Sequence, residues 1–307
     1  MLITSVLIPL ILGFVLIALV AGNNLSVCFG SVISSRILSR KSGIILTMAG
    51  YTAGLLLQGN LLSATVTRLM PIPTEFTIEA ALAIAIVIFV VSQLKRIPQS
   101  LSITFTMTLV GMAIASGISL NWVFLSGVAI VWLLIPILSF LAVLLTLKLV
   151  GTRERSNHIW AYTRLLKAIL IVASFFVAFT LGANTIGLIQ DFLPSTYYTI
   201  YISIAAIVAG SIIFSAGPLR RVGSDIIPIR YINAVSSQVV SAILVEIATV
   251  FGIPMSNTQT FVSSVYGAGA SYKSRLILKS PFILMVETWL ITAFIAFVLG
   301  FVVIKIA

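Results

Sequence analysis

The chain has 307 residues, of which 60% are apolar and only 8% are charged. A typical soluble domain is about 45–50% apolar and about 25% charged, and the mean hydropathy here is +1.21. So little polar material cannot cover a water-soluble fold of this size. The composition excludes a cytosolic enzyme, a secreted disulfide scaffold and a disordered chain, and it predicts an all-α polytopic membrane protein.

The net charge of +11 would suggest a nucleic-acid partner in a soluble protein. In a membrane protein it indicates basic residues that hold loops on the cytoplasmic side of a lipid bilayer. We therefore expect the bilayer, and no nucleic acid, as the partner of this surface. The sequence is compatible with a homo-oligomer and leaves the oligomeric state open.

Apolar runs separated by charged or turn residues predict ten membrane segments. Each run is long enough to cross, or nearly cross, a hydrocarbon core of about 30 Å. The runs are 4–36, 43–65, 78–94, 98–117, 121–148, 161–190, 197–216, 231–251, 255–271 and 280–304.

The loops between these segments predict the orientation. If all ten segments cross and both termini lie outside, nearly every basic residue falls on the inside. Only Arg68 and Lys305 fall on the outside. This is the distribution that cytoplasmic loops show in a plasma membrane protein. It requires the short fourth and ninth segments to cross the whole membrane.

The chain also contains an internal repeat. Ala21–Asn24 recurs as Leu181–Asn184, and Ile97–Phe105 recurs as Ile253–Phe261, in the same order and at nearly the same spacing. Five segments per half is an odd number, so the halves have opposite orientations. The sequence predicts two inverted repeats, residues 1–150 and 151–307, an architecture typical of secondary transporters.

Polar residues interrupt the first and sixth segments at matched positions. Glycines at 22 and 182 would allow the helices to break there, and such breaks persist in membranes only against protein or a watery cavity. Freed carbonyl groups and amide side chains are ligands for small ions. We expect a substrate or sodium site near Asn23, Asn24, Asn184 and Thr185.

The fourth and ninth segments each begin after a proline and are rich in hydroxyl groups. Proline suits the first turn of a helix, and the free amides that follow carry the positive end of the helix dipole. Two such half-helices or hairpins meeting in the membrane would bind an anion with neutral donors. The expected donors are Ser100, Ser102, Thr104, Ser256, Asn257 and Thr258.

Glu246 lies within the eighth segment, where a carboxyl group is costly and often functional. It is the candidate for proton coupling. No nucleotide-binding, nucleophile-elbow or zinc-protease motif is present, so we do not expect an enzyme or a bound cofactor. We expect sodium or a proton as the coupling ion.

At these residues the chain resembles the inorganic phosphate transporter family of secondary carriers. The family pattern G-A-N-D-V-A-N-S-F-G is similar to Ala21–Gly30, and G-A-N-D is similar to Gly182–Thr185. The pattern G-L-P-V-S-T-T-H is similar to Gly252–Gln259, and Gly217–Gly223 resembles the loop that precedes it. The resemblance implies an ion-coupled carrier of an inorganic oxyanion, usually phosphate.

The chain departs from the family at its acidic positions. The two Asp positions hold Asn24 and Thr185, and the membrane Glu positions fall on Tyr51 and Gln238. Gln259 replaces the histidine of the second hairpin, so Gln238 and Gln259 join Glu246 as coupling candidates. An acid-free site suits sulfate or another fully deprotonated oxyanion, which is one alternative. A second alternative is an anion channel or a transport-defective sensor.

Overall fold

The computed structural model describes residues 2–69, 74–95, 97, 99–150, 159–215, 231–271 and 279–307. All regular structure in these residues is helical. The first half contains α1 (Leu2–Ser34), α2 (Arg40–Gln58), η1 (Gly59–Leu62), α3 (Ser63–Leu69), α4 (Glu75–Lys95), α5 (Leu101–Ala115) and α6 (Trp122–Val150). The second contains α7 (Ile159–Leu181), η3 (Gly182–Ile186), α8 (Gly187–Gln190), α9 (Thr199–Ile213), α11 (Tyr231–Val250), α12 (Asn257–Ala270) and α13 (Lys279–Ile306).

Each of the ten predicted segments corresponds to a helical run. Seven of these runs, among the described residues, are long and apolar enough to cross a membrane. They are Val6–Ile33, Arg40–Leu69, Glu75–Lys95, Trp122–Leu149, Trp160–Gln190, Tyr231–Val250 and Ile283–Ile306. The prediction of an all-α polytopic membrane protein is confirmed.

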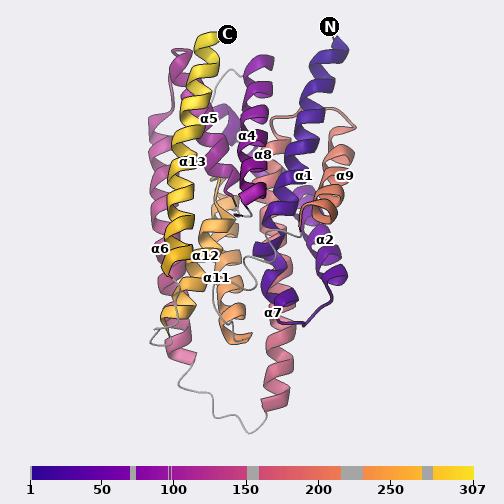
Figure 1. Cartoon of the computed structure of the whole chain (residues 1–307), viewed down its shortest axis with the longest axis vertical. Coiled ribbons are helices and arrows are strands. Elements are labelled where there is room, and N and C mark those ends of the chain that lie inside the picture. The colour runs from indigo at the N-terminus through magenta and orange to yellow at the C-terminus, as the bar shows by residue number, and fades with distance from the viewer. Residues whose placement is uncertain are drawn as a thin grey trace.

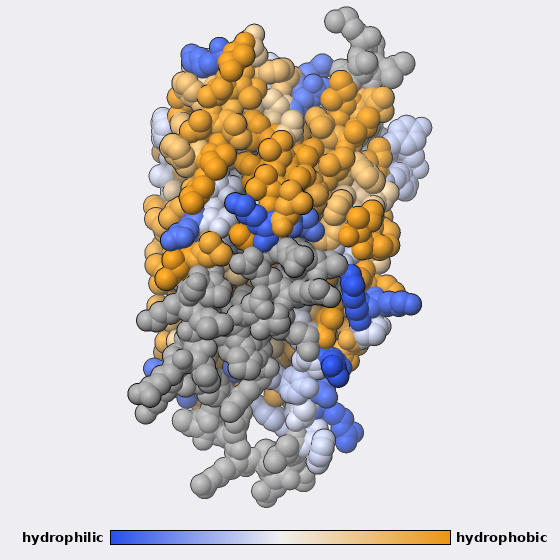
Figure 2. All heavy atoms as spheres, in the orientation of Figure 1, coloured by the Kyte–Doolittle hydropathy of each residue, from blue (hydrophilic) through white to orange (hydrophobic). Residues whose placement is uncertain are grey.

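The outer surface is apolar, as a lipid-facing surface must be. Leu94, Leu133 and Phe294 are each about two thirds or more exposed, and Figure 2 shows such side chains covering the upper part of the bundle. Trp122 and Trp160 are exposed at the first turns of α6 and α7, at opposite ends of the bundle. Aromatic residues are enriched at both membrane–water interfaces.

The ends of the chain and its midpoint lie at opposite ends of the bundle. Figure 1 shows both termini at one end, while α6 ends and α7 begins at the other. Helices α1 and α7 therefore run in opposite directions. Which side of the membrane the two termini face stays a prediction.

The helices pack in matched combinations. Helix α1 packs on α4 of its own half and on α9 of the other, while α7 packs on α11 and on α2. Likewise α5 packs on α13, and α12 packs on α6. The contacts of the two halves therefore correspond when α1, α2, α4, α5 and α6 are matched in order with α7, α9, α11, α12 and α13.

The fourth and ninth segments differ from expectation because they do not cross the bundle. Helices α5 and α12 have 15 and 14 residues, which at 1.5 Å per residue is only about 20 Å. In Figure 1, α4 and α5 lie in the half of the bundle next to the termini, and α11 and α12 lie in the other half. Each pair is a helical hairpin with its tip inside the bundle. Lys95, the last residue of α4, therefore lies near a hairpin tip and not in a loop at an end of the bundle.

The predicted break in the first segment is wrong. Helix α1 is a continuous α-helix through Gly22, and the corresponding stretch of the second half is a π-helical turn, η3, within a continuous helical run. The glycines serve close packing. A Cβ atom on Gly22 would lie 2.6 Å from the carbonyl oxygen of Gly210 on α9, and one on Gly182 would lie 2.8 Å from Cα of Tyr51 on α2.

The substitution Gly22→Ala should therefore push α1 and α9 apart. Overpacking of this kind costs about 1–3 kcal/mol, and we expect a lower thermal unfolding temperature of the purified protein in detergent. The matched control is Gly127→Ala on α6, where a Cβ atom meets nothing within 4 Å. Equal unfolding temperatures for the two variants would contradict the close-packing role.

Candidate functional site

The two hairpin tips are built in the same way. Ser100 and Ser256 are the N-cap residues of α5 and α12, each with an extended backbone. The Ser100 hydroxyl accepts a hydrogen bond from the Ile103 amide at 3.4 Å, and the Ser256 hydroxyl accepts one from the Gln259 amide at 3.2 Å. The other first-turn amides have no partner within their own helix, so each tip presents N–H groups and a positive dipole end.

The two tips touch each other. Ser102 on α5 donates a hydrogen bond of 2.7 Å to the Met255 carbonyl oxygen of the other hairpin. In the reverse direction, the Thr258 hydroxyl on α12 lies 3.4 Å from the Gln99 carbonyl oxygen. The N-termini of α5 and α12 therefore face one another in the interior of the bundle.

Two asparagines hold the tips by equivalent hydrogen bonds. Asn23 on α1 donates to the Ile97 carbonyl oxygen at 3.2 Å and accepts from the Gln99 amide at 2.8 Å. Asn184 in η3 donates to the Ile253 carbonyl oxygen at 3.0 Å and accepts from the Met255 amide at 2.8 Å. Each asparagine thus binds the residues one and three positions before the capping serine. Their role is to position the tips.

A small polar cavity lies between the tips. Its volume is about 10 Å³, which is room for about one water molecule. Seven of the predicted substrate residues line it, and all seven are buried: Asn24, Ser100, Ser102, Thr185, Ser256, Asn257 and Thr258. Leu101, Leu181 and Met255 complete the wall. The wall carries no ionisable side chain.

The hydroxyl groups around the cavity differ in their free hydrogen-bonding capacity. Ser102 donates its proton to Met255, and Thr258 donates to the Asn24 side-chain oxygen at 2.9 Å. Ser100 and Ser256 accept hydrogen bonds from backbone amides, so their hydroxyl protons remain to be donated. Together with first-turn amides from both helices, they can surround an anion with neutral donors.

Three predicted substrate residues lie outside the cavity wall. Asn23 and Asn184 are the positioning residues described above, and the Thr104 hydroxyl donates to the Ser100 carbonyl oxygen at 2.9 Å within α5. Three of the four predicted sodium ligands, the asparagines, are also engaged. The side-chain oxygens of Asn23, Asn24 and Asn184 each accept a hydrogen bond, and α1 has no break that would free its carbonyl groups.

The coupling candidates are separate from the cavity wall. Gln238 donates to the carbonyl oxygens of Val27 and Cys28 at 3.1 and 2.9 Å and so ties α11 to α1. Gln259 is half-buried on the first turn of α12. Glu246 accepts a hydrogen bond of 2.7 Å from Gln58 at the end of α2. Pro98 of the first tip lies outside the described residues.

Sequence reasoning missed the contacts that connect the cavity to its surroundings. Thr180, two residues before Gly182, accepts a hydrogen bond from Asn257 at 3.2 Å. Thr249, one turn after Glu246, accepts one from Asn184 at 3.0 Å. Both are single threonines in apolar helices, and nothing in the sequence separates them from threonines that bond only to their own helix.

Known proteins resemble this chain over most of its length. The phosphate transporter family profile matches residues 20–300. The chain is 24% identical over 306 residues to a protein of Methanocaldococcus jannaschii provisionally named a phosphate permease, covering 97% of each chain. It is 26% identical over 237 residues to a Bacillus subtilis protein provisionally named a low-affinity inorganic phosphate transporter, covering 72% of this chain and 71% of that protein.

Among solved structures, the fold is similar to that of a protein described as the sodium-dependent phosphate transporter. The TM-score is 0.87 at 16% identity, over 99% of this chain and 98% of the other. Short helices that meet at a buried polar site within a bundle of long apolar helices define the class, a polytopic membrane protein. Since the family profile covers most of its length, the chain belongs to the phosphate transporter family.

Replacing Asn184 should loosen the second hairpin tip. Asn184→Ala leaves the Ile253 carbonyl oxygen and the Met255 amide without their partner, and unpaired buried groups cost about 1–3 kcal/mol each. We expect a clear fall in the thermal unfolding temperature. Asn60→Ala at an exposed position is the control and should change it little. Equal effects of the two changes would contradict the positioning role.

Proposed function

We propose that this protein is a secondary transporter that carries an inorganic oxyanion, phosphate first among them, across the plasma membrane. The observation that supports this most directly is the pair of opposed helix N-termini at a buried cavity, with the Ser100 and Ser256 hydroxyl protons free to donate. Neutral donors at helix N-termini favour an anion. The phosphate transporters among its relatives support phosphate as the substrate.

Transport requires the two tips to separate. A cavity of about 10 Å³ cannot hold an ion of five heavy atoms. The hairpins come from opposite ends of the bundle, so withdrawal of one tip would open the cavity toward one side only. We infer alternating access by this movement. The matched packing of the helices supports two inverted repeats, residues 1–150 and 151–307, as the basis of the two states.

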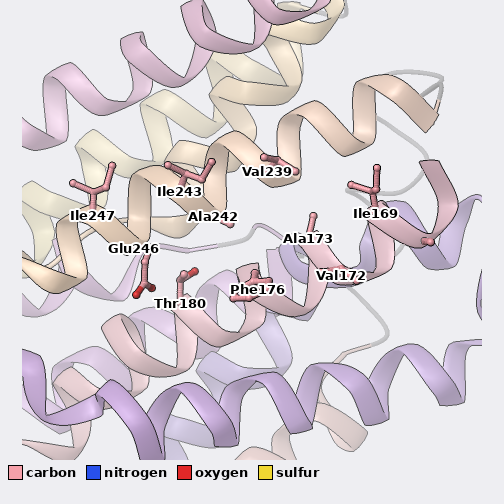
Figure 3. A pocket seen from close by; sticks show the side chains of 11 residues that line it. Ile169, Val172, Ala173, Phe176, Thr180, Val239, Ala242, Ile243, Glu246 and Ile247 are labelled. Carbon is pink, nitrogen blue, oxygen red and sulfur yellow. The ribbon is translucent and has the colours of Figure 1, made fainter. Parts of the chain in front are cut away.

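Glu246 is the carboxyl group that we propose for proton coupling. It extends from α11 toward α7 beside Thr180, at one end of an apolar groove of about 600 Å³ between these helices (Figure 3). One carboxyl oxygen accepts from Gln58, and the other is buried without a hydrogen-bond partner, so that oxygen can carry a proton. Lys167 of α7 lies far along the helix, over the ring of Tyr231 at the first residue of α11.

Two threonines near this carboxyl group, neither of them hydrogen-bonded to it, make hydrogen bonds to the hairpin tip or to the residue that holds it. Thr180, beside Glu246, accepts from Asn257 of the cavity wall. Thr249, one helical turn after Glu246, accepts from Asn184, which holds the tip. We infer that a change in the charge of Glu246 acts on α12 through its neighbours Thr180 and Thr249. Sodium is the alternative coupling ion, and it would have to displace hydrogen bonds already made by Asn23, Asn24 or Asn184.

Sulfate is the second candidate substrate. The observation in its favour is the cavity wall itself, which offers donors and no carboxylate to receive the proton of a phosphate ion. Purified protein in proteoliposomes, given labelled phosphate or labelled sulfate under separate sodium and proton gradients, distinguishes the substrates and the coupling ions. Unlabelled substrate inside the vesicles should accelerate uptake by a carrier and would not do so for a channel.

The double change Ser100→Ala, Ser256→Ala should weaken phosphate binding. Each loss removes a donor to a buried charged ligand, worth about 1–3 kcal/mol, so the half-saturating concentration should rise at least tenfold. Both serines are also helix caps, and Ser39→Ala is the matched control, because Ser39 caps the exposed start of α2 with a bond of 3.1 Å to the Ser42 amide. Unaltered affinity in the double variant would place the site elsewhere.

The change Glu246→Gln should abolish any dependence of uptake on a proton gradient while phosphate binding stays measurable. The amide keeps the size of the side chain but cannot bind and release a proton. Initial uptake rates with and without an imposed pH gradient give the measurement, and Glu75→Gln at the exposed start of α4 is the control. Proton-driven uptake that persists in Glu246→Gln would rule out this role.

A further inference from the structure

Asn257 of the second hairpin has a side-chain amide at the cavity wall. It is the first residue of α12, is 3% exposed, and lines the cavity beside Ser256. Its amide group is held from behind by Thr180 on α7, whose hydroxyl lies 3.2 Å from the Asn257 nitrogen Nδ2. The orientation of this amide decides which of its two ends remains for a ligand.

The Thr180 hydroxyl determines that orientation. It donates its single proton to the Val177 carbonyl oxygen at 3.0 Å. A hydroxyl group has one proton, so toward Asn257 it can only accept. The Asn257 atom that faces Thr180 must therefore be the donor nitrogen, and the other atom, Oδ1, is an acceptor.

The oxygen Oδ1 is buried and lacks a partner. Of the side chains that line the cavity, all of them within the described residues, Asn257 is the one with a buried oxygen that has no hydrogen bond. Buried acceptors are nearly always paired, and an unpaired one is costly. A ligand with an O–H group would satisfy it.

The opposite tip brings no second acceptor of this kind to the cavity wall, because its buried unpaired oxygen belongs to Gln99, which does not line the cavity. The residue equivalent to Asn257 in the first hairpin is Leu101, which also lines the cavity. Ser100 and Ser256 supply donors from both tips, but on the cavity wall a buried unpaired acceptor comes from the second tip only. Several donors and one acceptor match an oxyanion that carries several bare oxygens and a single proton.

We propose that Asn257 is a specificity-determining residue whose side-chain oxygen accepts the O–H group of monohydrogen phosphate or arsenate and thereby disfavours sulfate. This inference rests on the proposed function as an oxyanion transporter. Sulfate has no proton near neutral pH. Its oxygens and Oδ1 are all hydrogen-bond acceptors, so they would repel each other. The amide oxygen of Asn257 thus accepts the phosphate proton in place of a carboxylate, which the cavity wall does not contain.

The test is competition against labelled phosphate on the full-length protein in proteoliposomes. Arsenate has the O–H group, while sulfate and monofluorophosphate lack it near neutral pH, and monofluorophosphate keeps the phosphorus centre. We expect arsenate to compete about as well as phosphate. Sulfate and monofluorophosphate should compete about ten- to a hundredfold less well, the factor for one buried acceptor left unpaired.

Two variants address the acceptor and its orientation separately. Asn257→Leu, which copies the first hairpin, should bring the phosphate-to-sulfate ratio close to one. Thr180→Val removes the hydroxyl that orients the amide, so the amide can turn its N–H₂ group toward the ligand. The affinity for sulfate should then rise, a gain that a merely destabilised protein would not give. Asn257→Asp keeps an acceptor and should keep the preference for phosphate.

The control is Ser264→Ala, a buried position on α12 away from the cavity wall, which should leave the ratio unchanged. Equal competition by phosphate and sulfate in the native protein would overturn the inference but leave the oxyanion transporter intact. An unchanged ratio in both Asn257→Leu and Thr180→Val would also overturn it. The inference would also fail if Asn257→Leu lost the sodium dependence of uptake while its phosphate-to-sulfate ratio stayed constant, because Asn257 would then bind a cation. If none of the four anions binds, the proposed function fails and this inference fails with it.

Discussion

Two helix N-termini point at each other inside an apolar bundle, and this arrangement constrains the rest of the structure. Each N-terminus carries unpaired amides and about half a positive charge, and the surrounding lipid offers no water to satisfy them. The capping hydroxyls of Ser100 and Ser256 satisfy one amide in each helix. The remaining amides are left for the space between the tips, where an anion would be stabilised.

Two positive helix ends repel each other, so other elements of the structure must hold them in place. The support comes from α1 and η3, whose asparagines bind the backbone of the tips through both ends of the side-chain amide. A carboxylate could accept the Gln99 or Met255 amide but could not donate to the preceding carbonyl oxygen. The amide side chain is therefore suited to this position, and it holds the tip without adding charge near the cavity.

The geometry also depends on very close helix contacts. Gly22 lets α1 approach Gly210 of α9, and Gly182 lets η3 approach Tyr51 of α2. These contacts place Asn23 and Asn184, one and two residues further along, within reach of the hairpins. The same glycines that suggest a flexible backbone in the sequence thus give a rigid, closely packed frame around the tips.

By itself the sequence determined the membrane class, the ten helical segments and most of the cavity wall. Hydropathy and the two repeated motifs were sufficient for this, because a lipid environment forces long apolar helices and because serine before a helix start predicts a cap. Seven of the ten predicted substrate residues line one cavity.

The path of each segment was decided by tertiary structure. A run of apolar residues is equally compatible with a full membrane crossing and with one arm of a hairpin. A glycine in such a run is equally compatible with a helix break and with close packing of two helices. The partners of Asn257 and Glu246 were likewise invisible, because Thr180 and Gln58 are 77 and 188 residues away in the chain. Only the packing of α7, α2 and α11 brings these groups together, and local sequence patterns carry no information about contacts at that separation.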